Sequence, residues 1–142
     1  MSQRNYPDLH DHIKELRASN LLIEINDPIN KDTEMHPLVR WQFRGGIAEA
    51  DRKAFLFTNI IDSLGRKYDL PVIVGALATN PEIYRIGLGC KLDEVGKTWG
   101  RAISNPVKPR LIENAPCHEF VSTGNDLVGV GCGLDALPIP IS

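Results

Sequence analysis

The first part of the chain passes from a helical to an extended hydrophobic pattern. Leu9, Ile13 and Leu16 recur at offsets of four and three, which is the spacing of one helix face. Asp8 stands where the N-cap of that helix is expected. The run LLIEI at residues 21–25 is short, apolar and partly β-branched, and the NDPIN that follows is rich in turn residues. The pattern therefore predicts a helix, a strand and a turn, in that order.

A second helix and two further strands are predicted next. The helix begins near Thr33, with Pro37 in its first turn, where a proline is tolerated. AFLFTNI at residues 54–60 predicts one strand, and LPVIVGAL at residues 70–77 predicts another. The nearly continuous apolar run of the latter predicts burial on both faces. The polar stretch DSLGRKYD at residues 62–69 is expected to be exposed.

Two more helices complete the pattern. Asn80, Pro81 and Glu82 supply a cap, a proline at the first helical position and an acidic first turn for a helix that ends at Gly89. Residues 93–103 repeat apolar side chains at helical spacing until NPVKP interrupts them. The order helix, strand, helix, strand, strand, helix, helix predicts an α/β domain of mixed α+β layers.

The pattern of apolar and polar residues changes after these helices. HEFVST at residues 118–123 alternates enough to predict a strand, whereas VGVGCG at residues 128–133 is too rich in glycine for a regular element. Pro138 and Pro140 favour an extended segment. We place a boundary near residues 106–116, which divides the chain into a mixed α/β domain at 1–110 and a connecting segment at 111–142.

Composition and charge exclude some classes of protein. The chain has 142 residues, 42% of them apolar, which is enough for a core without metal or disulfide support. With 16 basic and 18 acidic side chains, its charge of -2 does not favour nucleic acid or an anionic membrane surface. The start MSQRNYPDLH lacks the order of a secretory signal, and no apolar run approaches the roughly 20 residues of a membrane helix. We expect a cytoplasmic protein. Its three cysteines, widely spaced, are expected to be reduced and mostly packed; they are Cys90, Cys117 and Cys132.

Two glycine-containing stretches suggest phosphate binding, and neither meets the requirements. GCKLDEVGKT at residues 89–98 ends like a P-loop, but six residues separate Gly89 from Gly96, and Asp93 and Glu94 would repel a phosphate. We interpret it as helix surface. GVGCG at residues 129–133 has no helix N-terminus after it to hold an anion, so we interpret it as a connection.

No set of polar side chains forms a recognisable active site. His10 and His12 are two residues apart and so point in different directions on a helix, which predicts surface positions. Each other candidate has a structural explanation or lacks a partner: His36 and His118 as bases, Asp32 and Glu34 near a helix start, Glu113 and Glu119 near the boundary, and Trp41 and Trp99 as packing anchors. We identify no catalytic, cofactor-binding or metal-binding residue.

The order of these stretches resembles the amino-terminal region of the UbiD-type decarboxylases. The resemblance covers nearly the whole chain. It is carried by DLHDHIKELRASNLLIEINDPINKDTEM, AFLFTNI, PVIVGALATNPEIYRIGLG, NPVKPRLIENAP and LDALPIP. One departure is the VGVGCG between NDL and LDALP, where family members pass more directly into the LPIP element. We therefore expect the join between domains to differ in length or mobility.

The resemblance implies a role within a larger enzyme. In that family the LPIP segment leads into a central split-barrel flavin domain, so residues 111–142 would include its first part. The complete enzyme would decarboxylate an aromatic or phenolic carboxylic acid, with reversal in some members, using prenylated FMN and a divalent metal, Mn or Mg. Its catalytic residues belong to the flavin domain, so this fragment alone is expected to be inactive.

The resemblance also implies partners. These are the flavin domain, in the same or a separate chain, a small aromatic acid as substrate, and further copies in a homo-oligomer. A different reading of the same domain is a free-standing, non-catalytic small subunit or binding module that serves a separate catalytic chain.

Overall fold

The computed structural model describes residues 8–113 and 115–141, and its helices begin and end close to the predicted positions. The first helix begins with a capping box at its N-terminus. The Asp8 side chain accepts from the backbone N–H of Asp11, and the Asp11 side chain accepts from the backbone N–H of Asp8. The third ends at Gly89, whose φ of 62° suits a residue without a side chain. The four helices are α1 (Leu9–Ala18), α2 (Met35–Arg44), α3 (Pro81–Leu88) and α4 (Val95–Ser104).

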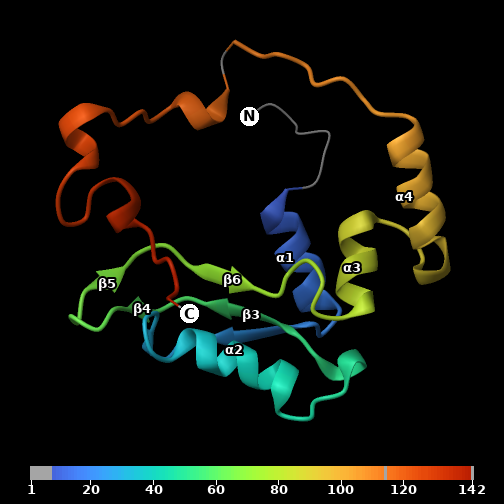
Figure 1. Ribbon diagram of the computed structural model, residues 1–142, viewed down its shortest axis with the longest axis horizontal. Helices are drawn as coiled ribbons and strands as arrows, with labels where there is room; N and C mark the ends of the chain where they lie inside the picture. The colour runs from blue at the N-terminus through green and yellow to red at the C-terminus, as the bar shows by residue number, and fades with distance from the viewer. Residues whose placement is uncertain (1–7, 114, 142) are drawn as a thin grey trace.

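The strands form two small three-stranded sheets. In the first, β3 (Ala54–Phe57) lies between a parallel β1 (Leu22–Ile25) and an antiparallel β6 (Val72–Val74). In the second, β4 (Ile60–Ile61) lies between a parallel β2 (Ile29–Asn30) and an antiparallel β5 (Lys67–Tyr68). Figure 1 shows the two sheets side by side.

Three predictions about the strands need correction. Residues 54–60 were predicted as one strand, but they form β3 and β4, which belong to different sheets. Residues 62–69 were predicted to be exposed, yet they contain β5 and the half-buried Tyr68. Residues 70–77 were predicted to be buried on both faces, but β6 is only half-buried, because it occupies an edge of its sheet and pairs on one side only.

The core lies on both faces of the first sheet. On one face, α2 packs through Met35 and Val39 against Phe55, Phe57 and neighbouring residues of the second sheet. On the other face, α1 and α3 bring Leu16 and Ile83 against Ala54 and Ala76. Figure 1 shows α2 on the opposite side of the sheet from α1 and α3. This arrangement confirms the predicted mixed α+β layers, and burying each large side chain stabilises the fold by about 1.5–3 kcal/mol.

The chain after α4 leaves this body and later returns to it. Residues 105–113 and 117–130 are exposed, and Figure 1 shows them in a wide arc from α4 towards the side of β4 and β5. The predicted strand at residues 118–123 is wrong for this chain. Beyond the 3-10 turn that ends at His118, those residues are irregular, because no strand in the described part of the chain pairs with them, and Phe120 and Val121 are 86% and 72% exposed. Leu137, before Pro138, is extended as predicted, with φ -93° and ψ 138°.

The helices are short. None of those in the described residues is both long and apolar enough to cross a membrane.

Candidate functional site

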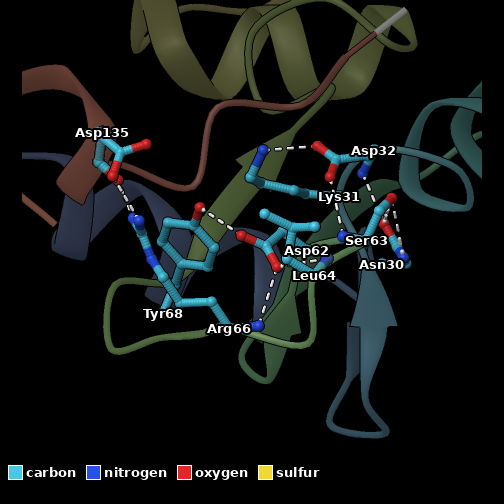
Figure 2. A network of polar contacts seen from close by, with 9 residues as sticks. All are labelled: Asn30, Lys31, Asp32, Asp62, Ser63, Leu64, Arg66, Tyr68 and Asp135. Atoms are coloured by element: carbon cyan, nitrogen blue, oxygen red, sulfur yellow. Dashed lines mark hydrogen bonds and ion pairs between the residues drawn. The ribbon is translucent and has the colours of Figure 1, made fainter. Parts of the chain in front are cut away.

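Polar side chains converge where the second sheet meets the returning chain. We call this group the Tyr68 cluster (Figure 2). It draws on β2, on the β4–β5 hairpin and on the segment that carries Asp135, which stand far apart in the sequence. Its members are Asn30, Lys31, Asp32, Asp62, Ser63, Arg66, Tyr68 and Asp135.

Asp62 organises the hairpin between β4 and β5. Its Oδ1 accepts from the backbone N–H groups of Leu64 and Arg66, each at 2.9 Å, and its own N–H donates to the Arg66 carbonyl at 3.0 Å. Its Oδ2 accepts from the Tyr68 hydroxyl at 3.2 Å. These donors, the Arg66 N–H above all, lower the pKa of Asp62. The carboxylate therefore acts as the central acceptor of the turn.

Tyr68 lies between two cations. The Arg66 guanidinium carbon is 4.5 Å from the ring centroid, and the Lys31 Nζ is 5.7 Å from it. Cations at these distances are attracted by the ring electrons. Burial is the main cause that raises the pKa of Tyr68, so its hydroxyl remains protonated and donates to Asp62.

Lys31 and Asp32 form the least exposed ion pair of the cluster. Their side chains are 11% and 18% exposed, with Nζ and Oδ1 2.6 Å apart. The Asp32 Oδ2 also accepts from the Ser63 N–H at 2.9 Å. The Lys31 contact is the largest cause that lowers the pKa of Asp32, and the same hydrogen bond raises that of Lys31. This pair ties the turn after β2 to the turn after β4.

Arg66 holds Asp135, which stands 69 residues further along the chain. One guanidinium nitrogen, Nη1, is 2.5 Å from the Asp135 Oδ2, and the other, Nη2, donates to the Asp135 backbone carbonyl. The same Oδ2 accepts from the Gly131 N–H at 2.6 Å. That N–H is the largest cause that lowers the pKa of Asp135, and Arg66 is the next.

The chemistry of the cluster is structural. Lys31 and Arg66 each donate to a carboxylate, and the pKa shifts of Asp32, Asp62 and Asp135 all favour the ionised form. A general acid or base at neutral pH needs a shift in the other direction for a carboxyl group. The cluster therefore joins β2, the β4–β5 hairpin and the segment of Asp135 through ionised carboxylates.

The Tyr68 cluster and the cavity between α1 and α3 do not fit a flavin phosphate or its metal. In residues 8–113 and 115–141, no group of three or more His, Cys, Asp or Glu side chains is placed to hold a metal ion. A cavity of 560 Å³ lies between α1 and α3, and three carboxylates in its lining, Asp8, Asp11 and Glu15, would repel a phosphate. Arg66 and Lys31 already face carboxylates.

The glycine-containing stretches lie as predicted. Lys97 and Thr98 are on the surface of α4, which follows a short 3-10 turn and not a strand. The GVGCG at residues 129–133 lies in turns, and the element after it is one 3-10 turn, Gly133–Ala136. Neither stretch forms a phosphate-binding loop.

Three predictions about isolated side chains are wrong. His12, predicted on the surface, is half-buried, and its Nε2 donates to the Ala76 carbonyl at 2.6 Å, because α1 packs on the turn after β6. Trp41 was predicted to anchor packing, but it is 61% exposed, since α2 turns Met35 and Val39 to the core instead. Trp99 was predicted to do the same, but it is also exposed.

The other candidates lie apart from the Tyr68 cluster. Trp99 is 46% exposed and donates through Nε1 to the Tyr84 hydroxyl. The three cysteines are free, and Cys117 is exposed while the other two are half-buried. The remaining positions are not brought together: His10, His118, Glu113 and Glu119 are exposed and His36 is half-buried.

Sequence reasoning missed the Tyr68 cluster itself. The available signal was the Asp-Ser-Leu-Gly-Arg order, in which Asp62 starts a turn and Gly65, with φ 81°, completes it. That signal predicts a hairpin, but it does not reveal that Arg66 reaches Asp135. The long separation of the two residues in sequence left no local pattern to read.

The fold and the cluster together define a mixed α+β domain with a structural polar site. The chain matches the family described as the 3-octaprenyl-4-hydroxybenzoate carboxy-lyase N-terminal domain, over residues 13–103. This match spans more than half of the chain, so the chain belongs to the UbiD N-terminal domain family. The resemblance to the amino-terminal region of UbiD-type decarboxylases is thereby confirmed.

A solved structure agrees with this assignment. The chain is similar to the UbiD-class enzyme HmfF from Pelotomaculum thermopropionicum, whose structure is a complex with FMN, with a TM-score of 0.68 and 23% sequence identity. The match covers 93% of this chain and 26% of that one, so this chain spans about a quarter of the length of that enzyme. The likeness confirms the fold.

Proposed function

We propose that this chain is the amino-terminal part of a UbiD-like carboxy-lyase that decarboxylates an aromatic or phenolic carboxylic acid, with reversal under excess CO2. The observation that carries the proposal is the family match at residues 13–103. We also propose that this enzyme is cytoplasmic. Prenylated FMN with Mn or Mg supplies the electron sink for loss of CO2, and both are held outside residues 1–142.

The division of the chain belongs to this proposal. Residues 1–110 are the domain proper, and residues 111–142 are the linker and the first part of the flavin domain. The boundary is supported by exposure, because residues 105–113 lie on the surface after α4 ends.

Exposed apolar side chains support a partner for this linker. Leu111, Phe120 and Val130 are between 86% and 96% exposed, although each is large and apolar. Apolar side chains gathered on one exposed segment mark an interaction surface. We propose that the flavin domain, in the same or a separate chain, covers them, and that the complete enzyme is a homo-oligomer.

Decarboxylation assays test the proposal. The protein extended beyond Ser142 is supplied with prenylated FMN and Mn²⁺, and CO2 release is measured over a panel of aromatic and phenolic acids. We expect turnover by the extended protein and none by residues 1–142 under the same conditions. Turnover by residues 1–142 alone would contradict the proposal, and so would an extended protein that binds the flavin but decarboxylates no acid of the panel.

A mixing experiment addresses the small-subunit alternative. Residues 1–142 are added to a separately produced UbiD-type flavin chain that lacks an amino-terminal domain. If the small-subunit alternative holds, the two chains co-elute in size-exclusion chromatography and the rate of CO2 release rises. If both are parts of one polypeptide, activity requires that they be covalently joined.

A further inference from the structure

We propose that Arg66 and Asp135 form a latch that holds residues 131–141 against the second sheet and so sets the direction in which the chain continues from this domain. Both residues of the latch belong to this chain. Its use in orienting a larger carboxy-lyase rests on the proposed function.

In residues 106–113 and 115–130, the backbone hydrogen bonds before the latch are local. Examples are His118 N–H to the Ala115 carbonyl and Val128 N–H to the Asn125 carbonyl. Residues 105–113 and 117–130 are exposed along their whole length. The position of residues 131–141 is therefore not inherited from α4 and must be set where the chain returns.

Two residues of the Tyr68 cluster receive the returning chain. Arg66 donates with two nitrogens to Asp135, one to the side chain and one to the backbone carbonyl. Further along, the Ile141 N–H donates to the Lys31 carbonyl at 3.2 Å. Figure 2 shows Asp135 facing Arg66 beside Tyr68. The segment is therefore held at the Tyr68 cluster by a charged pair and a backbone hydrogen bond, and Pro138 between them is buried.

Contacts within the hairpin hold Arg66 independently of residues 131–141. Its backbone exchanges hydrogen bonds with Asp62 in both directions, at 2.9 and 3.0 Å. Its guanidinium carbon lies 4.5 Å from the centroid of the Tyr68 ring. An arginine already ordered in this way loses little conformational entropy when it binds a carboxylate. This distinguishes Arg66 from the neighbouring Lys67, whose exposed side chain makes no hydrogen bond or ion pair with residues 8–113 or 115–141.

Asp135 is also preorganised. Its Oδ2 accepts from the Gly131 N–H as well as from Arg66, so the turn at residues 131–135 presents the carboxylate in one orientation. The latch consequently fixes a turn rather than a single side chain. The folded turn and the Arg66 contact stabilise each other.

Hydrogen exchange measured by mass spectrometry tests the latch on the 142-residue chain. In Arg66→Gln, we expect the peptide spanning residues 131–141 to exchange about fivefold to tenfold faster than in the wild type. Peptides from β3 and α3 should be unchanged. The Arg66→Lys variant retains the charge but not the two-nitrogen geometry, so it should give an intermediate rate. The matched control is Lys67→Gln, which should leave residues 131–141 as protected as in the wild type.

A second variant covers the case in which Arg66→Gln disturbs the hairpin. Asp135 is 53% exposed, and its replacement by Asn leaves β4 and β5 untouched. We expect Asp135→Asn to raise the exchange of residues 131–141 with no change in β5. The latch is overturned if Asp135→Asn exchanges in this peptide within twofold of the wild type. This readout involves no catalysis, so it is independent of whether the extended protein decarboxylates any acid.

Discussion

Phe57 offers the sharpest test of how the domain is stabilised. It is the largest fully buried side chain, it lies on the central strand β3, and its ring stacks on Phe55 with centroids 5.9 Å apart. Replacing a buried phenylalanine by alanine costs about 3–5 kcal/mol in free energy of unfolding, because apolar contacts are lost and a cavity remains. A domain of this kind has roughly 5–15 kcal/mol in total. Phe57→Ala should therefore remove a large share of its stability.

The assay is urea unfolding followed by tryptophan fluorescence. With a denaturant dependence of about 2 kcal/mol per molar urea, a loss of about 4 kcal/mol lowers the midpoint by about 2 M. Trp41 reports on α2, which packs against the face that carries Phe57, and Trp99 reports on α4. Replacing each tryptophan in turn by phenylalanine isolates the two signals. Both should move together if the two core clusters unfold as one unit.

Two control variants test whether the loss of stability comes from the buried phenylalanine. Phe57→Leu fills more of the space and should cost less than Phe57→Ala. Leu64→Ala removes an equally apolar side chain that is 95% exposed, so it should change the stability by no more than about 0.5 kcal/mol. A loss below about 1.5 kcal/mol for Phe57→Ala, or one equal to that of Leu64→Ala, would refute the view that this cluster carries the fold.

Three further predictions concern buried polar groups and the carboxylates. Asn80 is 2% exposed, caps α3 through the Ile83 N–H at 2.9 Å and donates to the Arg52 carbonyl, so Asn80→Ala should lower the urea midpoint by an amount equivalent to about 2 kcal/mol. Gln42 is 3% exposed, donates to the Lys53 carbonyl at 2.8 Å and accepts from the Lys53 N–H at 2.7 Å, so Gln42→Leu should cost about 2–4 kcal/mol in chemical unfolding. Gln42→Glu should also destabilise the fold, because its buried carboxylate would face the Lys53 carbonyl. The pKa of Asp62 is lower in the folded state than its ordinary value of 3.8. Its contribution to the free energy of unfolding is therefore present above about pH 4 and is lost as the pH falls further. Urea midpoints measured from about pH 6 to pH 2 should fall less steeply for Asp62→Asn than for the wild type. Equal slopes for the two proteins would contradict this last expectation.

The helices were predictable because their signals are local. Asp8 and Asn80 stand next to the residues they cap, and Gly89 stands where its positive φ is needed. The strand β1 was equally visible, because its apolar run is bounded by turn residues. These elements depend on neighbours within about four residues, and the sequence shows those neighbours directly.

The sheets and the polar cluster were less predictable because they depend on distant partners. Residues 54–60 read as one strand, and only the pairing of Ala54 with Leu22 and of Ile60 with Ile29 divides them between two sheets. Residues 118–123 have the alternation of a strand but find no partner in the described chain, so they are irregular beyond His118. A strand needs a neighbour to satisfy its backbone groups, whereas a helix satisfies its own.

The sequence by itself determined the helix boundaries, the mixed α+β class and, through the order of its stretches, the UbiD-type family. Only the tertiary structure decided which strands pair, that His12 is half-buried and Trp41 exposed, and that Arg66 reaches Asp135. The physical reason is range: capping and helical periodicity act between near neighbours, while strand pairing, burial and ion pairs join residues that the folded chain alone brings together.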